Sequence, residues 1–271
     1  MESGCAMTRR PKLGQHFLAD AAYRQKIAES LEIGEQDWAV EVGAGRGELT
    51  ELLARRAGHV IAIELDRKLV AGLREKFHGD ERIDVIEGDI LDLDLAALVR
   101  EAPGGMCSVF GNLPYYITSP IIHRLLNARE AIRAMALLMQ REVAERVIAA
   151  PGSRNYSYLS VLVQLFTRPA ILFHVPPGAF SPRPKVQSSL VEFLMSPVLP
   201  DWSRERIESF LVFARRCFAQ KRKSLRNNLA VFYPPNGLDE VIRSLRLPPK
   251  ARAEQIPIPQ LRDLFEKLKR L

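Results

Sequence analysis

The chain has 271 residues, of which 47% are hydrophobic and 26% are charged; this composition excludes a disordered protein and allows one large α/β domain with a small appendage. No run of about eighteen apolar residues occurs and the first eleven residues are polar, so we expect a cytoplasmic protein without a membrane span or secretory signal. The net charge of +7 comes from the last quarter, because residues 201–271 hold 16 Lys and Arg against 8 Asp and Glu, whereas residues 1–200 hold 23 against 24.

The cysteines and histidines give no sign of a disulfide framework or a metal centre. Cys5, Cys107 and Cys217 are odd in number and far apart, and the sequence has no CxxC motif or Cys/His cluster. His59 and His174 lie inside apolar runs, which favours packing over catalysis. We therefore expect no bound metal.

From Trp38 to Glu192, short apolar runs rich in β-branched residues alternate with amphipathic segments. This alternation predicts βαβ units and a mostly parallel sheet, in which ligands bind at the carboxyl ends of the strands. One predicted helix begins near Arg46 and places Leu49, Leu52 and Leu53 on one face. The predicted strands are Trp38–Val42, Val60–Glu64, Asp84–Glu87, Ser108–Gly111, Met135–Met139, Ala170–His174 and Ser189–Leu194.

A break at residues 196–200 separates this region from an all-helical pattern. We expect a domain boundary near residue 200, with a catalytic domain over residues 1–200 and a basic helical domain over residues 201–271. Asp201 or Ser203 is expected to cap the first helix of the second domain. The predicted helices are Arg204–Gln220, Ser224–Phe232, Leu238–Leu245 and Gln260–Leu271.

A glycine-rich turn follows the first predicted strand, with Gly43, Gly45 and Gly47 in a GxGxG spacing. Glycine allows a tight turn and a close approach of the backbone to a ligand. The spacing differs from the GxGxxG of dinucleotide-binding proteins and suits S-adenosylmethionine, which has no phosphate to place at a helix N-terminus. An ordinary strand–helix turn is the alternative interpretation.

Acidic residues end the next two predicted strands. Glu64 is expected to accept hydrogen bonds from both ribose hydroxyls of the cofactor. Asp89 is expected to accept one from the adenine amino group, with Ile90 beside it in the same site. Asp66 and Asp92 are expected to cap the helices that follow. The recurrence of these features at successive strand ends strengthens the prediction of a cofactor site.

The fourth predicted strand ends in the sequence Asn-Leu-Pro-Tyr-Tyr, residues 112–116. An adenine amino nitrogen is a poor nucleophile, and the Asn112 side-chain oxygen with a backbone carbonyl of Leu113 or Pro114 can accept its two N–H groups. Pro114 stiffens the turn and Tyr115 can stack on an extruded base. The motif therefore indicates methyl transfer to adenine by positioning and electrostatics. A proline turn with two core aromatics is the alternative.

These motifs, in this order, resemble those of the ribosomal RNA adenine dimethyltransferase family. The resemblance rests on Gly14–Leu18, Glu41–Thr50, Glu64–Asp66, Gly88–Asp89, Asn112–Tyr115, Tyr156–Val161, Phe180–Val186, Lys221–Leu229 and Arg252–Gln255. It implies a Rossmann-like class I S-adenosylmethionine-dependent methyltransferase sheet, of α/β class, with a small all-helical C-terminal domain. It also implies that His16 and Leu18 contact the cofactor.

The same resemblance implies a substrate. The expected reaction is N6,N6-dimethylation of two adjacent adenosines in a hairpin loop near the 3′ end of 16S rRNA, on the 30S ribosomal subunit or its precursor during late assembly. The Leu225–Leu229 segment and the basic C-terminal region favour this target over 23S rRNA, which is the substrate of the antibiotic-resistance type in the same family. Nothing in the sequence demands a dimer, and we expect a monomer.

A basic segment without acidic residues lies between Glu208 and Asp239. Its cations alternate with apolar residues, which predicts a helix–turn–helix with basic side chains outward that contacts RNA phosphates. A solvated helix face is the alternative interpretation. The predicted RNA-binding residues are Arg215, Arg216, Lys221, Arg222, Lys223 and Arg226.

Two other classes of protein fit the sequence less well. An NAD-dependent oxidoreductase is disfavoured by the GxGxG spacing, by the Asn112–Tyr116 motif and by the lack of an evident hydride-transfer acid. A non-catalytic assembly factor is disfavoured by the intact glycine turn together with Glu64, Asp89 and Asn112. Binding to a pre-ribosomal particle can nevertheless coexist with catalysis.

Overall fold

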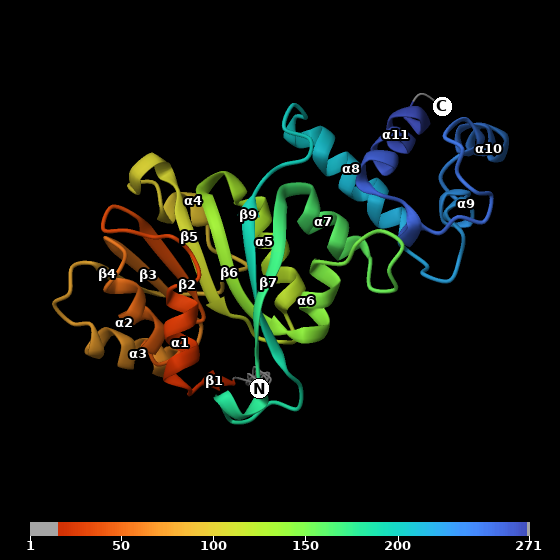
Figure 1. The fold of residues 1–271 in the computed structure, drawn as a ribbon. Coiled ribbons are helices and arrows are strands. Elements are labelled where there is room, and N and C mark those ends of the chain that lie inside the picture. Colours follow the sequence, from red (N-terminus) through yellow and green to blue (C-terminus); the bar gives the residue numbers. More distant parts are fainter. Residues whose placement is uncertain (1–15, 270–271) are drawn as a thin grey trace, which may run out of the picture.

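The computed structural model describes residues 16–269, so Cys5, Gly14 and Gln15 lie outside the described residues. Its main element is a seven-stranded sheet with the order β4-β3-β2-β5-β6-β9-β7 (Figure 1). The first five strands in this order are parallel, and β9 runs antiparallel to both of its neighbours. The strands are β2 (Trp38–Val42), β3 (His59–Glu64), β4 (Ile83–Glu87), β5 (Cys107–Asn112), β6 (Ile132–Gln140), β7 (Thr167–Val175) and β9 (Ser188–Met195).

Helices cover both faces of this sheet, as parallel strands require. Helices α1, α2 and α3 pack on one face, and α4, α5 and α7 pack on the other (Figure 1). In β2, Ala39 packs toward the first face, whereas Val40 and Val42 pack toward the second. The helices of this region are α1 (Ala21–Ala28), α2 (Glu48–Ala54), α3 (Arg67–Lys76), α4 (Leu95–Leu98), α5 (Thr118–Asn127), α6 (Arg141–Val147) and α7 (Tyr158–Phe166).

All seven predicted strands are confirmed, and each differs from its predicted bounds by three residues or fewer at either end. Two short strands were missed: β1 (Phe17–Leu18) and β8 (Phe180–Ser181) pair antiparallel to form a separate small sheet. The α/β fold with a mostly parallel sheet is thereby confirmed.

Two local predictions in this region are corrected. Asp66 does cap α3, but Asp94 and not Asp92 caps α4, through a 3.2 Å hydrogen bond from the backbone N–H of Ala97. The helix expected near Arg46 begins at Glu48, because Gly47 has a φ of +73° and cannot lie within a right-handed helix.

The C-terminal region is all helical and lies beyond the β7 edge of the sheet (Figure 1). Helix α8 is capped by Ser203, one of the two expected caps. It ends three residues earlier than predicted, and the amide of Asn228 donates to the carbonyls of Cys217 and Gln220 just beyond it. The helices are α8 (Arg204–Cys217), α9 (Leu225–Leu229), α10 (Pro235–Ser244) and α11 (Ile258–Leu268).

The other predicted helix bounds shift by a few residues for identifiable reasons. Helix α9 begins after Ser224, which is its N-cap. Helices α10 and α11 begin earlier than predicted because proline in the first turn favours helix initiation. We propose the division at residue 200, which lies between the last strand and α8. The apolar core nevertheless continues across it, since Leu162, Leu199 and Phe210 belong to one cluster.

No helix within residues 16–269 has the length and apolar character needed to cross a membrane.

Candidate active site

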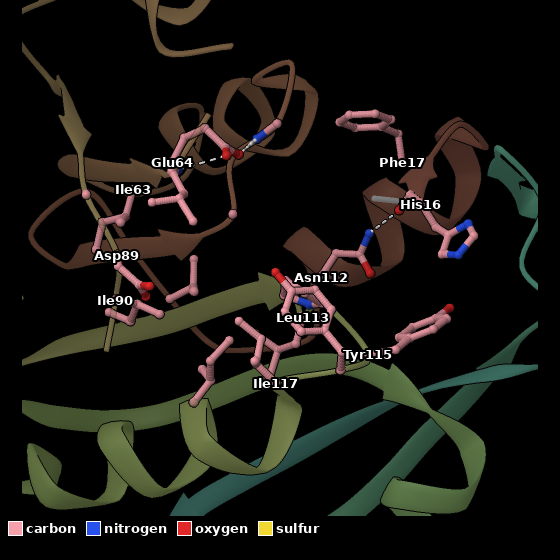
Figure 2. A pocket seen from close by; sticks show the side chains of 18 residues that line it. His16, Phe17, Ile63, Glu64, Asp89, Ile90, Asn112, Leu113, Tyr115 and Ile117 are labelled. Atoms are coloured by element: carbon pink, nitrogen blue, oxygen red, sulfur yellow. Dashed lines mark hydrogen bonds between the residues drawn. The ribbon is translucent and has the colours of Figure 1, made fainter. Parts of the chain in front are cut away.

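A pocket lies at the carboxyl ends of β2, β3, β4 and β5, where the fold places ligands (Figure 2). It encloses about 830 Å³ including its open mouth. The lining residues are His16, Phe17, Val42, Gly43, Gly45, Ile63, Glu64, Leu65, Gly88, Asp89, Ile90, Asn112, Leu113, Pro114, Tyr115, Tyr116, Ile117 and Ile121.

The glycine turn forms one wall of the pocket. Gly43 donates to the Ile63 carbonyl over 2.9 Å, and this bond fixes the turn to the end of β3. Gly45 has a φ of +59°, and a Cβ there would lie 3.3 Å from the ring of Phe17. Glycine at position 45 therefore provides both the backbone conformation and the space that this wall requires.

Glu64 is buried and holds the turn in place. Its Oε1 accepts hydrogen bonds from the N–H groups of Leu65 and Asp66, at 2.8 and 2.9 Å, and its Oε2 accepts one from Gly45 at 2.9 Å. A carboxylate offers about four acceptor positions. One position on Oε2 therefore stays open to a ligand, whereas two ribose hydroxyls were expected from the sequence.

Asp89 follows β4, the neighbour of the strand that ends in Glu64, and lies on the same side of the pocket as Glu64 (Figure 2). Its Oδ1 accepts a 3.0 Å hydrogen bond from the N–H of Leu91, while Oδ2 has no partner within residues 16–269. Tyr116 lies at the mouth with 58% of its surface exposed. Burial of the phenol and the charge of Asp89 raise the pKa of Tyr116. The free oxygen of Asp89 is suited to accept a hydrogen bond from a ligand amine.

Asn112 lies between the two acids, Glu64 and Asp89, and Tyr115 (Figure 2). Its side-chain amide has one defined orientation. Its Nδ2 donates to the His16 carbonyl over 2.8 Å, so its Oδ1 stays available as an acceptor (Figure 2). The Pro114 carbonyl already accepts from Ile117 N–H and from the Thr118 hydroxyl. The Leu113 carbonyl accepts no hydrogen bond within residues 16–269. The structure thus favours Leu113 over Pro114 as the second acceptor.

Tyr115 is fixed at both its ring and its hydroxyl. Its hydroxyl lies 2.7 Å from Ser188 Oγ, and its ring stacks on His16 at a centroid distance of 5.4 Å. His16 Nδ1 donates to the Pro182 carbonyl over 2.7 Å, because a carbonyl can only accept. His16 therefore covers one face of the Tyr115 ring.

Leu18 is the one predicted cofactor residue that the structure does not bring to the pocket. Successive side chains of a strand point to opposite faces. In β1, Phe17 faces the pocket while Leu18 packs into the core beside Phe180. Phe17, Tyr116 and Ile117 line the pocket without having been predicted, although strand alternation and position in the acceptor motif were available signals.

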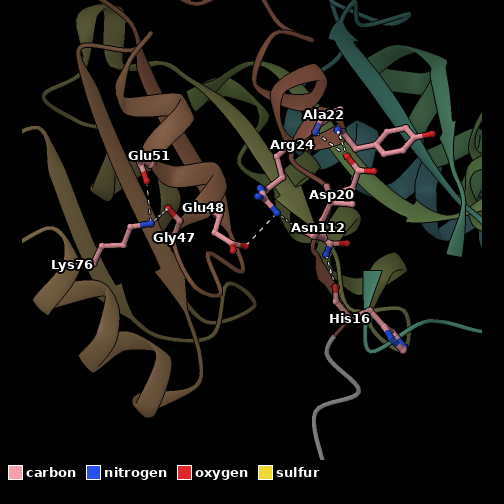
Figure 3. A network of polar contacts seen from close by, with 11 residues as sticks. His16, Asp20, Ala22, Arg24, Gly47, Glu48, Glu51, Lys76 and Asn112 are labelled. Carbon is pink, nitrogen blue, oxygen red and sulfur yellow. Dashed lines mark hydrogen bonds and ion pairs between the residues drawn. The ribbon is translucent and has the colours of Figure 1, made fainter. Parts of the chain in front are cut away.

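A network of polar contacts attaches the N-terminal segment to the glycine turn (Figure 3). Arg24 donates to the Leu18 carbonyl over 2.7 Å and lies 3.6 Å from the carboxylate of Glu48. On the other side, Lys76 donates to the Gly47 carbonyl over 3.0 Å and lies 3.3 Å from Glu51. The pocket wall is therefore supported from both α1 and α3.

Glu41 lies under the turn and is the most perturbed acid of the site. It is buried and accepts a 2.5 Å hydrogen bond from the Thr50 hydroxyl. Burial raises the pKa of Glu41 to about 8, against the opposing effect of the Thr50 hydrogen bond. Below that pH the residue is a neutral acid in the core beneath the ligand pocket.

The predicted RNA-binding cations differ in how far they are already engaged. Arg226 forms a two-point ion pair with Asp239, at 2.6 and 2.8 Å. Lys221 donates to the Arg154 carbonyl over 2.8 Å. Arg215 and Arg216 lie over the rings of Tyr158 and Phe232, at 5.1 and 4.3 Å. The side chains of Arg222 and Lys223 make no ion pair with residues 16–269.

Sequence comparison finds close relatives over almost the whole chain. A family model described as ribosomal RNA adenine dimethylase matches residues 6–270. The ribosomal RNA small subunit methyltransferase A of Acidobacterium capsulatum is 45% identical over 260 residues, covering 96% of this chain and 91% of that protein. The protein of the same description from Koribacter versatilis is 37% identical over 279 residues, covering 99% and 98%.

Solved structures agree with this match. The 23S rRNA methyltransferase ErmE has a TM-score of 0.70 at 26% identity, covering 93% of this chain and 99% of that one. A dimethyladenosine transferase from Plasmodium falciparum has a TM-score of 0.76 at 23% identity, covering 94% and 98%, and shows the fold alone. The fold is that of class I S-adenosylmethionine-dependent methyltransferases. A match of this extent, on a chain whose fold agrees with it, makes the protein a member of the ribosomal RNA adenine dimethylase family.

Proposed function

We propose that this enzyme transfers methyl groups from S-adenosylmethionine to the N6 atoms of two adjacent adenosines near the 3′ end of 16S rRNA. Its substrate is the 30S subunit or its precursor, and it acts as a cytoplasmic monomer. The observation that carries the proposal is the pair of open acceptors, Asn112 Oδ1 and the Leu113 carbonyl, beside a pocket at the strand ends. The relatives described as small subunit methyltransferases support the choice of subunit.

The residues of the pocket fit S-adenosylmethionine. The glycine wall admits close approach at Gly45, where a Cβ would meet Phe17. The open position on Glu64 Oε2 suits a ribose hydroxyl, and the free Oδ2 of Asp89 suits the adenine amine. Ile63 and Ile90 supply apolar surface between these two acids. When bound, S-adenosylmethionine supplies a methyl group activated by its sulfonium charge.

The acceptor motif can orient an adenine for attack. Asn112 Oδ1 and the Leu113 carbonyl accept the two N–H groups of N6, which favours the pyramidal nitrogen and directs its lone pair. Tyr115 stacks on the base with its free face. The proton released from N6 leaves to solvent, so the motif needs no histidine base.

Methyl transfer from labelled S-adenosylmethionine to unmethylated 30S and 50S particles, followed by mass spectrometry of the RNA, tests the proposal. We expect dimethyladenosine at adjacent sites of 16S rRNA. Label in 23S rRNA alone would mean that the substrate is 23S rRNA and that the methyl-transfer reaction is as proposed. The structural similarity to ErmE allows this outcome. Absence of label on both particles, with S-adenosylmethionine bound, would contradict the ribosomal assignment.

A further inference from the structure

A second pocket lies where the C-terminal helices meet the sheet domain, away from the strand ends. It encloses about 560 Å³ including its open mouth. The loop before α7 and the first residues of α7 form one wall, and the turn between α8 and α9 forms the other. The lining residues are Tyr156, Ser157, Tyr158, Leu159, Cys217, Phe218, Gln220, Lys221, Lys223, Asn228, Ala253 and Glu254.

Tyr156 is the unusual member of this pocket. Only 1% of its surface is exposed, and its hydroxyl has no hydrogen-bond partner within residues 16–269. The ring packs edge-on against Phe218 at a centroid distance of 5.9 Å. Burial raises the pKa of this phenol to about 12, so the hydroxyl remains a donor. A buried hydroxyl without a partner costs stability, and a phenylalanine would avoid that cost.

The same wall presents further donors. Tyr158 and Leu159 are the first two residues of α7, and their backbone N–H groups have no acceptor within residues 16–269. A helix N-terminus of this kind attracts anions. Tyr156, in the preceding turn, lines the same pocket.

Cations surround the pocket. Lys221 donates one of its three N–H groups to the Arg154 carbonyl, and Lys223 is exposed at the rim. Arg215 lies over the ring of Tyr158, so its charge is also at this edge. The one acid in the lining, Glu254, lies 3.9 Å from Arg252, which offsets its charge. The pocket is therefore rich in donors and positive in charge.

The walls are held in place without a ligand. Gly152 donates to the Glu254 carbonyl over 2.7 Å, and Leu225 donates to the Ala251 carbonyl over 2.7 Å. Asn228 fixes the turn after α8 through its bonds to the carbonyls of Cys217 and Gln220. The backbone of both walls is thus held in place before any ligand binds.

We propose that this junction pocket binds a backbone phosphate of the substrate RNA, with the Tyr156 hydroxyl, the N-terminus of α7, Lys221 and Lys223 as its donors. The choice of RNA as the source of the phosphate rests on the proposed function. The contact would let the C-terminal helices and the catalytic domain hold the same point of the RNA. It is a phosphate site in addition to the contacts expected from the cations on the α8–α9 surface.

The test is the variant Tyr156→Phe in the full-length protein. Its unfolding free energy in urea is expected to equal or exceed that of the parent, because the hydroxyl has no internal partner. Its affinity for unmethylated 30S particles is expected to fall about tenfold. The slope of log K against log salt should stay as in the parent, because the hydroxyl carries no charge, whereas Lys221→Met should make it shallower by about 0.7–0.9. Tyr23→Phe, which removes a hydroxyl on α1, is the matched control and should change neither affinity nor slope.

Lys221→Met completes a double-mutant cycle. If both residues hold one phosphate, the double variant loses no more affinity than about the larger single loss, whereas additive losses contradict the shared site. An unchanged affinity for 30S particles in Tyr156→Phe also overturns the inference. Inorganic phosphate that stabilises the parent but not Tyr156→Phe, without any loss of affinity for 30S particles in that variant, assigns the pocket to a free anion and overturns the RNA source. The methyl-transfer assay on the parent protein judges the proposed function separately.

Discussion

The strand-end pocket and the junction pocket differ in how many of their polar groups are already bonded. In the first, Glu64 accepts three backbone hydrogen bonds and the Asn112 amide is held by the His16 carbonyl. In the second, the Tyr156 hydroxyl and the first N–H groups of α7 have no partners within residues 16–269. Methyl transfer needs atoms held within a fraction of an ångström, whereas a phosphate contact needs free donors and positive charge. The difference matches those two tasks.

The largest expected effect concerns Glu41, a buried acid beneath the first pocket with no cation hydrogen-bonded to it within residues 16–269. Its pKa is about 8 in the folded protein against an ordinary value of 4.5, so folding favours the neutral acid. Its contribution to stability is complete below pH 4.5, is lost as pH rises toward 8, and amounts to about 5 kcal/mol at most. Urea unfolding at several pH values should show that Glu41→Gln removes this loss.

The matched control for this measurement is Glu75→Gln, which changes an exposed acid on α3. It should leave the pH dependence of the unfolding free energy as in the parent. If Glu41→Gln keeps the parent's dependence on pH, the carboxyl of Glu41 is ionised in the folded protein and the proposed burial cost is wrong.

Asn112→Ala tests the acceptor half of the first pocket. The variant removes Oδ1, one of the two open acceptors, and we expect kcat for methyl transfer to fall about 100- to 1,000-fold. Affinity for 30S particles should persist, because the RNA contacts lie elsewhere. Asn127→Ala, at the exposed end of α5, is the control and should keep full activity. Loss of particle binding together with activity would assign Asn112 to the fold or to docking.

Gly45→Ala tests whether the glycine wall serves the cofactor or only the turn. A residue with a Cβ at φ +59° costs about 1–2 kcal/mol of stability, and here the Cβ also meets Phe17. Gly79→Ala imposes a similar strain at φ +83° with nothing within 4 Å of the added Cβ. Both variants should lose stability, Gly45→Ala somewhat more because its Cβ also meets Phe17, but calorimetry should show only Gly45→Ala losing affinity for S-adenosylmethionine, by about tenfold. Equal affinities would mean that the wall does not contact the cofactor.

The smallest expected effect separates two cations of the basic segment. Lys223→Met should reduce the salt slope of 30S binding by about 0.7–0.9. Arg226→Met should reduce it less, because the charge of Arg226 is already paired with Asp239. A larger change for Arg226 than for Lys223 would show that the ion pair opens when RNA binds.

Much of this molecule follows from local sequence patterns. The parallel strands are predictable because short apolar runs of four or five residues between helical segments favour buried strands. Glu64, Asp89 and Asn112 were found because each ends such a run, and the fold then brings strand ends together. Pairings between distant segments were missed: β1 has two residues and exists through its contact with β8, far along the chain.

The other differences between the predicted and the observed structure arise from side-chain contacts between residues that are far apart in the sequence. The sequence between Glu208 and Asp239 has no acid, yet Asp239 itself, thirteen residues after Arg226, pairs with it in space. The end of α8 depends on the amide of Asn228, eleven residues after Cys217. The orphan hydroxyl of Tyr156 was invisible for the same reason, since a missing partner can be recognised only when all neighbours are known.

The position of β9 between β6 and β7 has a consequence for synthesis on the ribosome. Strand β7 is made before β9, but it pairs with the sheet only through β9. Until Met195 has emerged, β6 therefore keeps an open edge whose residues from Met135 to Met139 are buried in the finished protein. Open apolar edges recruit other strands. The nascent chain is thus most prone to aggregation in the interval between the emergence of β6 and that of β9, and mutations that slow β9 insertion should lower the yield of soluble protein.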